Sequence, residues 1–177
     1  MNENDQFWLP GVSRRKQRRR TRLWVMLAAP VMAILFQTYA PLLAGVFSYL
    51  ELPLLMVIYF SAGRRSPIGG LLAGAAVGLA QDALSHRPIG LLGMVKTIAG
   101  YAASSLGLRL DTDNPLVRFF LAGFFFAGHQ LLFWILRRAL LNDPASPALA
   151  ATFLAAVVNG ALAVPLFHAL DKLRENP

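Results

Sequence analysis

Long apolar runs, separated by short groups of proline, glycine and charged residues, dominate the chain. Six of these runs predict helices, at 23–40, 52–62, 67–84, 91–108, 115–136 and 147–170. Ser66 before Pro67, and Asn114 before Pro115, are typical of helix starts, because a polar side chain caps the first turn and proline suits its first position. The pattern predicts an all-α protein.

The second run is the hardest to delimit. Residues 41–50 are also apolar, but the clear helical signal begins at Leu52. The second helix therefore either begins at Leu52, or begins near Val46 and contains Glu51. The first alternative makes it a short helix.

Length and composition place these helices in a membrane. The chain has 177 residues, of which 56% are hydrophobic, and it has no cysteine. Six spans of roughly 20 residues each leave room only for short loops and tails. This excludes an extramembrane catalytic domain, a transporter with its own ATPase, and a disulfide-stabilised secreted scaffold. We expect one transmembrane domain over 23–170, between a tail at 1–22 and a short tail at 171–177.

The basic residues are concentrated before the first helix. The formal net charge is +8. A cluster of basic residues just before Leu23 consists of Arg14, Arg15, Lys16, Arg18, Arg19, Arg20 and Arg22. Cytoplasmic flanks of membrane helices are rich in Lys and Arg, and such clusters attract anionic lipid headgroups. Their position favours membrane lipid or a cytoplasmic filament protein, and not nucleic acid, as the partner of the tail.

The remaining basic residues predict the orientation. With six spans, the side of the two chain ends holds the seven residues of the tail together with Arg64, Arg65, Arg109, Arg118, Lys172 and Arg174. The opposite side holds Arg87, Arg137 and Arg138. This bias predicts that both ends lie in the cytoplasm. A five-span arrangement, with one end outside, stays open.

Small residues recur on one face of the third and fourth predicted helices. The third helix has Gly70, Gly74 and Gly78 at intervals of four, and the fourth has Gly93, Gly100, Ser104 and Gly107 at intervals of three, four and seven. Such spacing allows the backbones of neighbouring membrane helices to approach closely. We expect these residues to form a helix-packing stripe.

Asp82 and Lys96 are the most prominent charged residues within the spans. Each lies seven positions from Ile89, in the turn between the third and fourth helices. An antiparallel hairpin would bring them to a similar depth, and a charge in lipid is costly unless it is paired or hydrated. We therefore expect them to face each other or to share a polar pocket. An internal ion pair, a small-molecule site and a partner contact are the alternatives.

The other intramembrane polar residues, which include Gln37, His129 and Asn159, form no catalytic constellation. His129 and Asn159 are most simply groups that form hydrogen bonds between helices. The histidines lie on separate elements without the spacing of metal ligands. The sequence predicts a protein that is not an enzyme and that needs neither a metal nor a cofactor.

Several motifs resemble one family. The segments 52–60 (LPLLMVIYF), 78–91 (GLAQDALSHRPIGL) and 96–101 (KTIAGY) are similar to the rod shape-determining membrane proteins of the MreD family. The end of the chain is similar as well, with 157–160 (VVNG), Pro165 and 171–174 (DKLR). The long arginine-rich tail lies outside the resemblance.

This resemblance implies a multi-pass protein of the bacterial inner membrane that serves cell elongation. Its expected partners are an MreC-like bitopic scaffold and, through it, the actin-like MreB and the peptidoglycan polymerase and transpeptidase. The family also resembles in fold the substrate-binding subunits of energy-coupling-factor vitamin transporters. Such a subunit is the alternative function, and a lipid-handling enzyme or flippase is a third.

Overall fold

The computed structural model describes residues 20–21, 23–64, 66–85, 88–144 and 146–175. Its elements are β1 (Arg20–Thr21), α1 (Leu23–Leu43), the 3-10 helix η1 (Gly45–Tyr49), α2 (Leu52–Arg64), α3 (Pro67–Leu84), α4 (Leu91–Gly107), α5 (Pro115–Leu141), α6 (Leu149–Lys172) and β2 (Arg174–Glu175). Helices make up nearly all of this structure, which confirms the all-α prediction. The strands have two residues each.

Among the described residues, four helices are long and apolar enough to cross a membrane. They are α1, α3, α5 and α6, with mean hydropathies from 1.3 to 2.0 over their candidate spans. Helix α4 has 17 residues and contains Lys96, and α2 has 13 residues. At 1.5 Å per residue, α2 is about 20 Å long, which is less than the roughly 30 Å of a hydrocarbon core.

Helix α2 occupies the centre of the bundle. Residues 53–62 are all buried, and α2 contacts α1, α3, α4, α5 and α6. A helix that is apolar on every side is stable only where it is surrounded, since it has no polar face to turn outward. The core therefore lies around α2, with Leu54, Leu55 and Ile58 fully buried.

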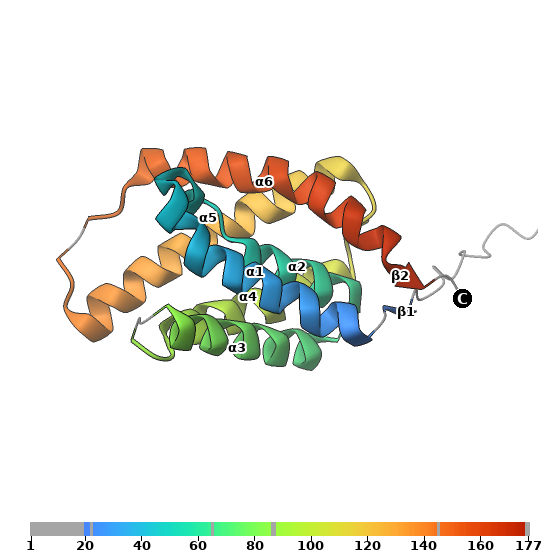
Figure 1. Ribbon diagram of the computed structural model, residues 1–177, viewed down its shortest axis with the longest axis horizontal. Coiled ribbons are helices and arrows are strands. Elements are labelled where there is room, and N and C mark those ends of the chain that lie inside the picture. The colour runs from blue at the N-terminus through green and yellow to red at the C-terminus, as the bar shows by residue number, and fades with distance from the viewer. Residues whose placement is uncertain (1–19, 22, 65, 86–87, 145, 176–177) are drawn as a thin grey trace, which may run out of the picture.

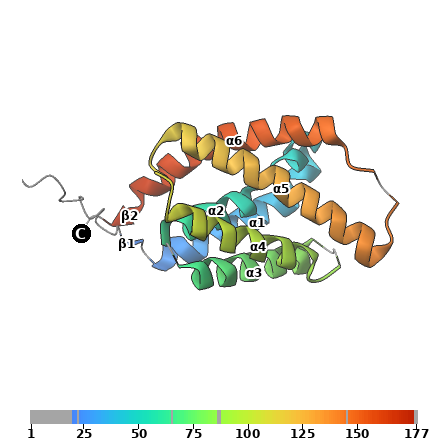
Figure 2. The same ribbon diagram turned by 180° about the vertical axis from the view of Figure 1, so that it is seen from behind.

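The helices alternate in direction, so that the connections gather at two ends of the bundle. Figures 1 and 2 show the α2–α3 and α4–α5 connections at the end that carries β1 and β2, and the α3–α4 and α5–α6 connections at the other. The strands pair antiparallel, with Arg20 opposite Glu175 and Thr21 opposite Arg174. The first and last described elements thus lie side by side.

Most predicted helix boundaries agree with the structure within a few residues. Helix α3 begins at Pro67, where the Ser66 hydroxyl oxygen accepts a bond from the Gly69 N–H, and Asn114 caps α5 in the same way through Leu116. Helix α5 continues five residues beyond its predicted end. Near this end, the guanidinium groups of Arg137 and Arg138 lie over the rings of Phe133 and Trp134. Long basic side chains can in this way cover apolar surface at the end of a span.

The alternative in which the second helix begins near Val46 is wrong. Leu50 is extended between η1 and α2, and Glu51 precedes the helix. The reason is tertiary, because Asn159 of α6 binds the backbone on both sides of Leu50, as described below.

Candidate functional site: a buried polar network

Four polar side chains from four parts of the chain meet inside the bundle. Glu51 precedes α2, Lys96 lies on α4, His129 on α5 and Asn159 on α6. All four are buried, and Lys96 and Asn159 are completely so. The sequence had indicated Lys96, His129 and Asn159 as intramembrane polar residues without connecting them, and had left open whether Glu51 precedes the second helix or lies within it.

Lys96 is the centre of this network. Its Nζ lies 3.2 Å from Oε2 of Glu51 and 3.3 Å from Nε2 of His129. The His129 ring is nearly parallel to that of Phe133, with 6.3 Å between the ring centroids. The positive charge is therefore matched by a carboxylate inside the bundle, which a buried charge requires.

Asn159 fixes the junction between η1 and α2. Its Oδ1 accepts a hydrogen bond from the backbone N–H of Glu51 at 2.9 Å, and its Nδ2 donates to the carbonyls of Tyr49 and Ala155, each at 2.8 Å. The bonds to Glu51 and Tyr49 satisfy backbone groups that no helix satisfies at this point, and a bilayer offers no water to replace them. Asn159 thereby positions the backbone of Glu51 and hence the carboxylate that meets Lys96.

The expected pairing of Asp82 with Lys96 is wrong. Asp82 is completely buried, and its carboxylate accepts hydrogen bonds from the N–H groups of Gly90, Leu92 and Gly93 at 2.9, 3.3 and 3.2 Å. The first N–H groups of a helix lack partners within it and carry partial positive charge, so a carboxylate is stabilised there. Asp82 thus caps α4 from the end of α3, and the four-carbon stem of Lys96 carries its ammonium group to Glu51.

The small residues lie at two close helix contacts. A Cβ built on Gly74 would collide with the carbonyl oxygen of Lys96, and one on Gly78 with that of Leu92. Gly70 and Gly100 face each other's carbonyl oxygens, and a Cβ on Gly70 would come within 2.9 Å of the Ser104 Cβ.

The other two glycines of the stripe have different neighbours. Gly93 lies against the Leu79 side chain of α3, whereas Gly107 lies against the backbone of Ala62 in α2. The stripe therefore serves mainly the α3–α4 contact, and its last member serves α4–α2.

A second polar cluster lies at the end of the bundle that carries the strands. The Arg118 guanidinium is 2.5 Å from one carboxylate oxygen of Asp171, and the Tyr59 hydroxyl donates to the other at 2.9 Å. The Arg118 Nε donates to the carbonyl oxygen of Thr112 at 2.7 Å. In the sequence Arg118 is only a topology signal, because its partner Asp171 lies 53 residues away and no spacing rule connects them.

The remaining predicted residues are not in these clusters. Gln37 is partly buried on α1, and its Oε1 has no hydrogen-bond partner among the described residues. Of the basic cluster, Arg14, Arg15, Lys16, Arg18, Arg19 and Arg22 lie outside the described residues, and Arg20 is described through its backbone in β1.

The observed partners of the acidic and basic side chains in the buried network are side chains of other elements of the bundle. Three cavities formed by described residues are lined by none of Glu51, Lys96, His129 or Asn159. Within the same part of the chain, no group of three His, Asp or Glu residues is arranged to hold a metal ion. The observed geometry is that of residues that hold helices together.

Comparison with protein families matches residues 18–173 to rod shape-determining protein MreD. Comparisons with curated proteins and with solved structures gave no match. The matched segment begins in the basic tail, continues through helices α1 to α6 and ends at Leu173, just after α6. It therefore contains the buried network, the glycine contacts and the Arg118–Asp171 cluster. From this match over most of its length, together with the four helices of its described residues that are long and apolar enough for a membrane, the chain belongs to the MreD family of rod shape-determining membrane proteins.

Proposed function

We propose that this protein is a non-enzymatic component of the bacterial cell-elongation complex in the inner membrane. It binds an MreC-like bitopic scaffold and thereby helps to direct peptidoglycan synthesis by the polymerase and transpeptidase. The observation that carries the proposal is the family match over residues 18–173. The buried polar residues support it, because their contacts join helices.

The proposal includes six spans with both ends in the cytoplasm. The pairing of β1 with β2 supports an even number of crossings, since it brings the two ends of the described chain together. At that same end Arg109 follows α4, Arg118 lies in the first turn of α5 and Lys172 is the last residue of α6. Arg137 and Arg138 lie in the last turns of α5 at the other end. This distribution agrees with the rule that cytoplasmic flanks are rich in basic residues.

Gentle detergent extraction of the tagged protein from its native membrane, followed by mass spectrometry of the proteins extracted with it, tests this function. We expect a bitopic elongation scaffold to be recovered, and peptidoglycan synthases with it. Loss of rod shape on depletion, restored by the wild-type chain, is the expected cellular result. Retention of normal shape and an unaltered scaffold complex after deletion would refute the proposal.

The alternative is a substrate-binding subunit of an energy-coupling-factor type transporter, motivated by the charged residues inside the membrane. It predicts recovery of ABC-type ATPases with a second membrane subunit. It also predicts that Lys96 and His129 contact a ligand, whereas the structure gives them Glu51 and each other as partners.

A further inference from the structure

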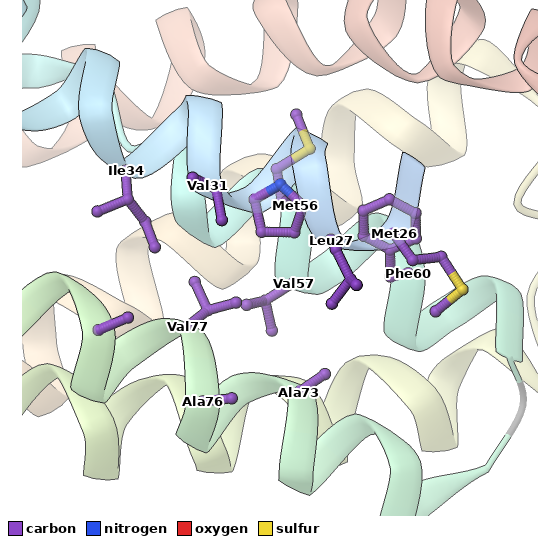
Figure 3. Close-up of a pocket in the computed structure, with 12 residues that line it drawn as sticks. Met26, Leu27, Val31, Ile34, Met56, Val57, Phe60, Ala73, Ala76 and Val77 are labelled. Atoms are coloured by element: carbon purple, nitrogen blue, oxygen red, sulfur yellow. The ribbon is translucent and has the colours of Figure 1, made fainter. Parts of the chain in front are cut away.

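An apolar groove lies between α1, α2 and α3. Its volume is about 450 Å³, within the roughly 300–1,000 Å³ of small-molecule sites. Figure 3 shows side chains from all three helices turned toward the same space, among them Val31 of α1, Val57 of α2 and Val77 of α3. The twelve residues that line it are all apolar.

The groove is closed at its floor and open at its side. Val57 and Phe60 of α2 are buried and form the floor, whereas Leu27 and Val31 of α1 are exposed at its rim. Ala76 and Ala80 of α3 form the opposite rim. Their side chains are single methyl groups, so this rim does not close the groove. In a membrane this opening faces the acyl chains of the bilayer.

One end of the groove approaches the basic end of the bundle. Phe60 lies four residues before Arg64, the last residue of α2, and Met26 lies three residues after Leu23, the first of α1. At 1.5 Å per residue these positions are about 6 Å and 5 Å from the ends of their helices. Arg20, in β1, comes just before α1 at this same end. The apolar walls therefore begin about one helical turn from Arg64, and six residues along the chain from Arg20.

We propose that this groove binds an acyl chain of an anionic phospholipid whose headgroup lies at the arginine-bearing end of the bundle. Arginines lie near one end of the groove, and apolar side chains line its interior. This arrangement matches the charged headgroup and the apolar acyl chain of an anionic lipid that lies along the helices. Basic residues at a membrane surface attract such headgroups. This inference is independent of the proposed function.

The test uses the full-length protein in phosphatidylcholine vesicles that contain a small fraction of lipid with a photoreactive acyl chain. The photoreactive lipid is phosphatidylglycerol in one sample and phosphatidylcholine in the other, and labelled peptides are mapped by mass spectrometry. We expect labelling of the peptides that contain Met26 and Phe60 to be about five-fold stronger with phosphatidylglycerol, the effect of roughly one basic residue near an anionic lipid. Arg64→Gln should reduce this preference for phosphatidylglycerol.

Ala76→Phe fills the groove from its rim and should abolish most of this labelling. Ala83→Phe, at an exposed alanine of the same helix outside the groove lining, is the matched control and should leave it unchanged. Ala80→Leu replaces Ala76→Phe if the latter does not fold. Equal labelling by the two lipids, or full labelling of a folded Ala76→Phe variant, would overturn the proposal. Loss of labelling when an equimolar bitopic partner is added would also overturn it, in favour of a partner helix in the groove.

Discussion

The ammonium group of Lys96 lies 3.2 Å from a carboxylate oxygen of Glu51, and the two residues are 45 positions apart in the chain. Both are buried, so neither charge can be compensated by water. A buried ion pair of this kind need not add stability compared with two apolar residues, but removing one partner leaves the other charge uncompensated. The structure therefore predicts that the effects of substituting these two residues on the free energy of unfolding are strongly coupled.

Lys96→Met and Glu51→Gln should each lower the free energy of unfolding by about 3–5 kcal/mol. The double variant should lose much less than the sum of the two. Thermal unfolding of the four proteins in one detergent gives the comparison as a double-mutant cycle. Additive losses would contradict the ion pair.

Asp82→Leu should destabilise the turn between α3 and α4, because it removes the acceptor of three backbone N–H groups. Each buried donor left without an acceptor costs about 1–3 kcal/mol. Asp82→Asn keeps one acceptor oxygen and should be milder. Thermal unfolding and hydrogen exchange at Gly90, Leu92 and Gly93 measure the effect. Unchanged exchange in Asp82→Leu would show that the cap contributes nothing.

Gly74→Leu should prevent the close contact of α3 with α4 and reduce the folded yield in detergent, because even a Cβ there meets the Lys96 carbonyl. Gly128, on α5, is the matched control, since a Cβ at that position has no neighbour within 4 Å. Gly128→Ala should be neutral or stabilise by up to about 1 kcal/mol through lower backbone entropy in the unfolded chain. Wild-type behaviour of Gly74→Leu in size-exclusion and thermal assays would refute the packing contact.

Asn159→Leu should release the junction between η1 and α2. Three hydrogen bonds are lost, and two of them hold backbone groups of Tyr49 and Glu51. We expect faster hydrogen exchange in residues 45–51, with little change in α3. A uniform increase over all helices would instead indicate general destabilisation and would count against a local role.

Asp171→Asn should destabilise the strand-bearing end of the bundle by about 1.5–3 kcal/mol, the range of hydrogen bonds to charged groups. Its partner Arg118 is nearly buried, whereas Arg137 of the Arg137–Asp143 pair is 44% exposed in its side chain. Asp143→Asn is therefore the control, with an expected loss below about 1 kcal/mol. Equal losses in the two variants, measured by thermal unfolding, would contradict the difference in burial.

Local signals in the sequence determined the helices and the contact between α3 and α4. Apolar runs, proline and capping residues depend on interactions within a few residues, which is why α3 begins at Pro67 as predicted. Glycines at intervals of four give α3 one face without side chains, whatever helix lies opposite. The short turn after Leu84 makes α4 the neighbour of α3. The length and apolar character of α1, α3, α5 and α6 likewise follow from composition alone.

Only the tertiary structure decided which polar groups meet. Asp82 and Lys96 are equally distant from their shared turn, but the unpartnered N–H groups at the start of α4 take the carboxylate, and Glu51 takes the ammonium. Glu51 is available because Asn159, more than 100 residues away, holds the backbone before α2. Such pairings depend on how the helices pack around α2. This packing is a property of the whole bundle, and the spacing of residues within one segment does not determine it.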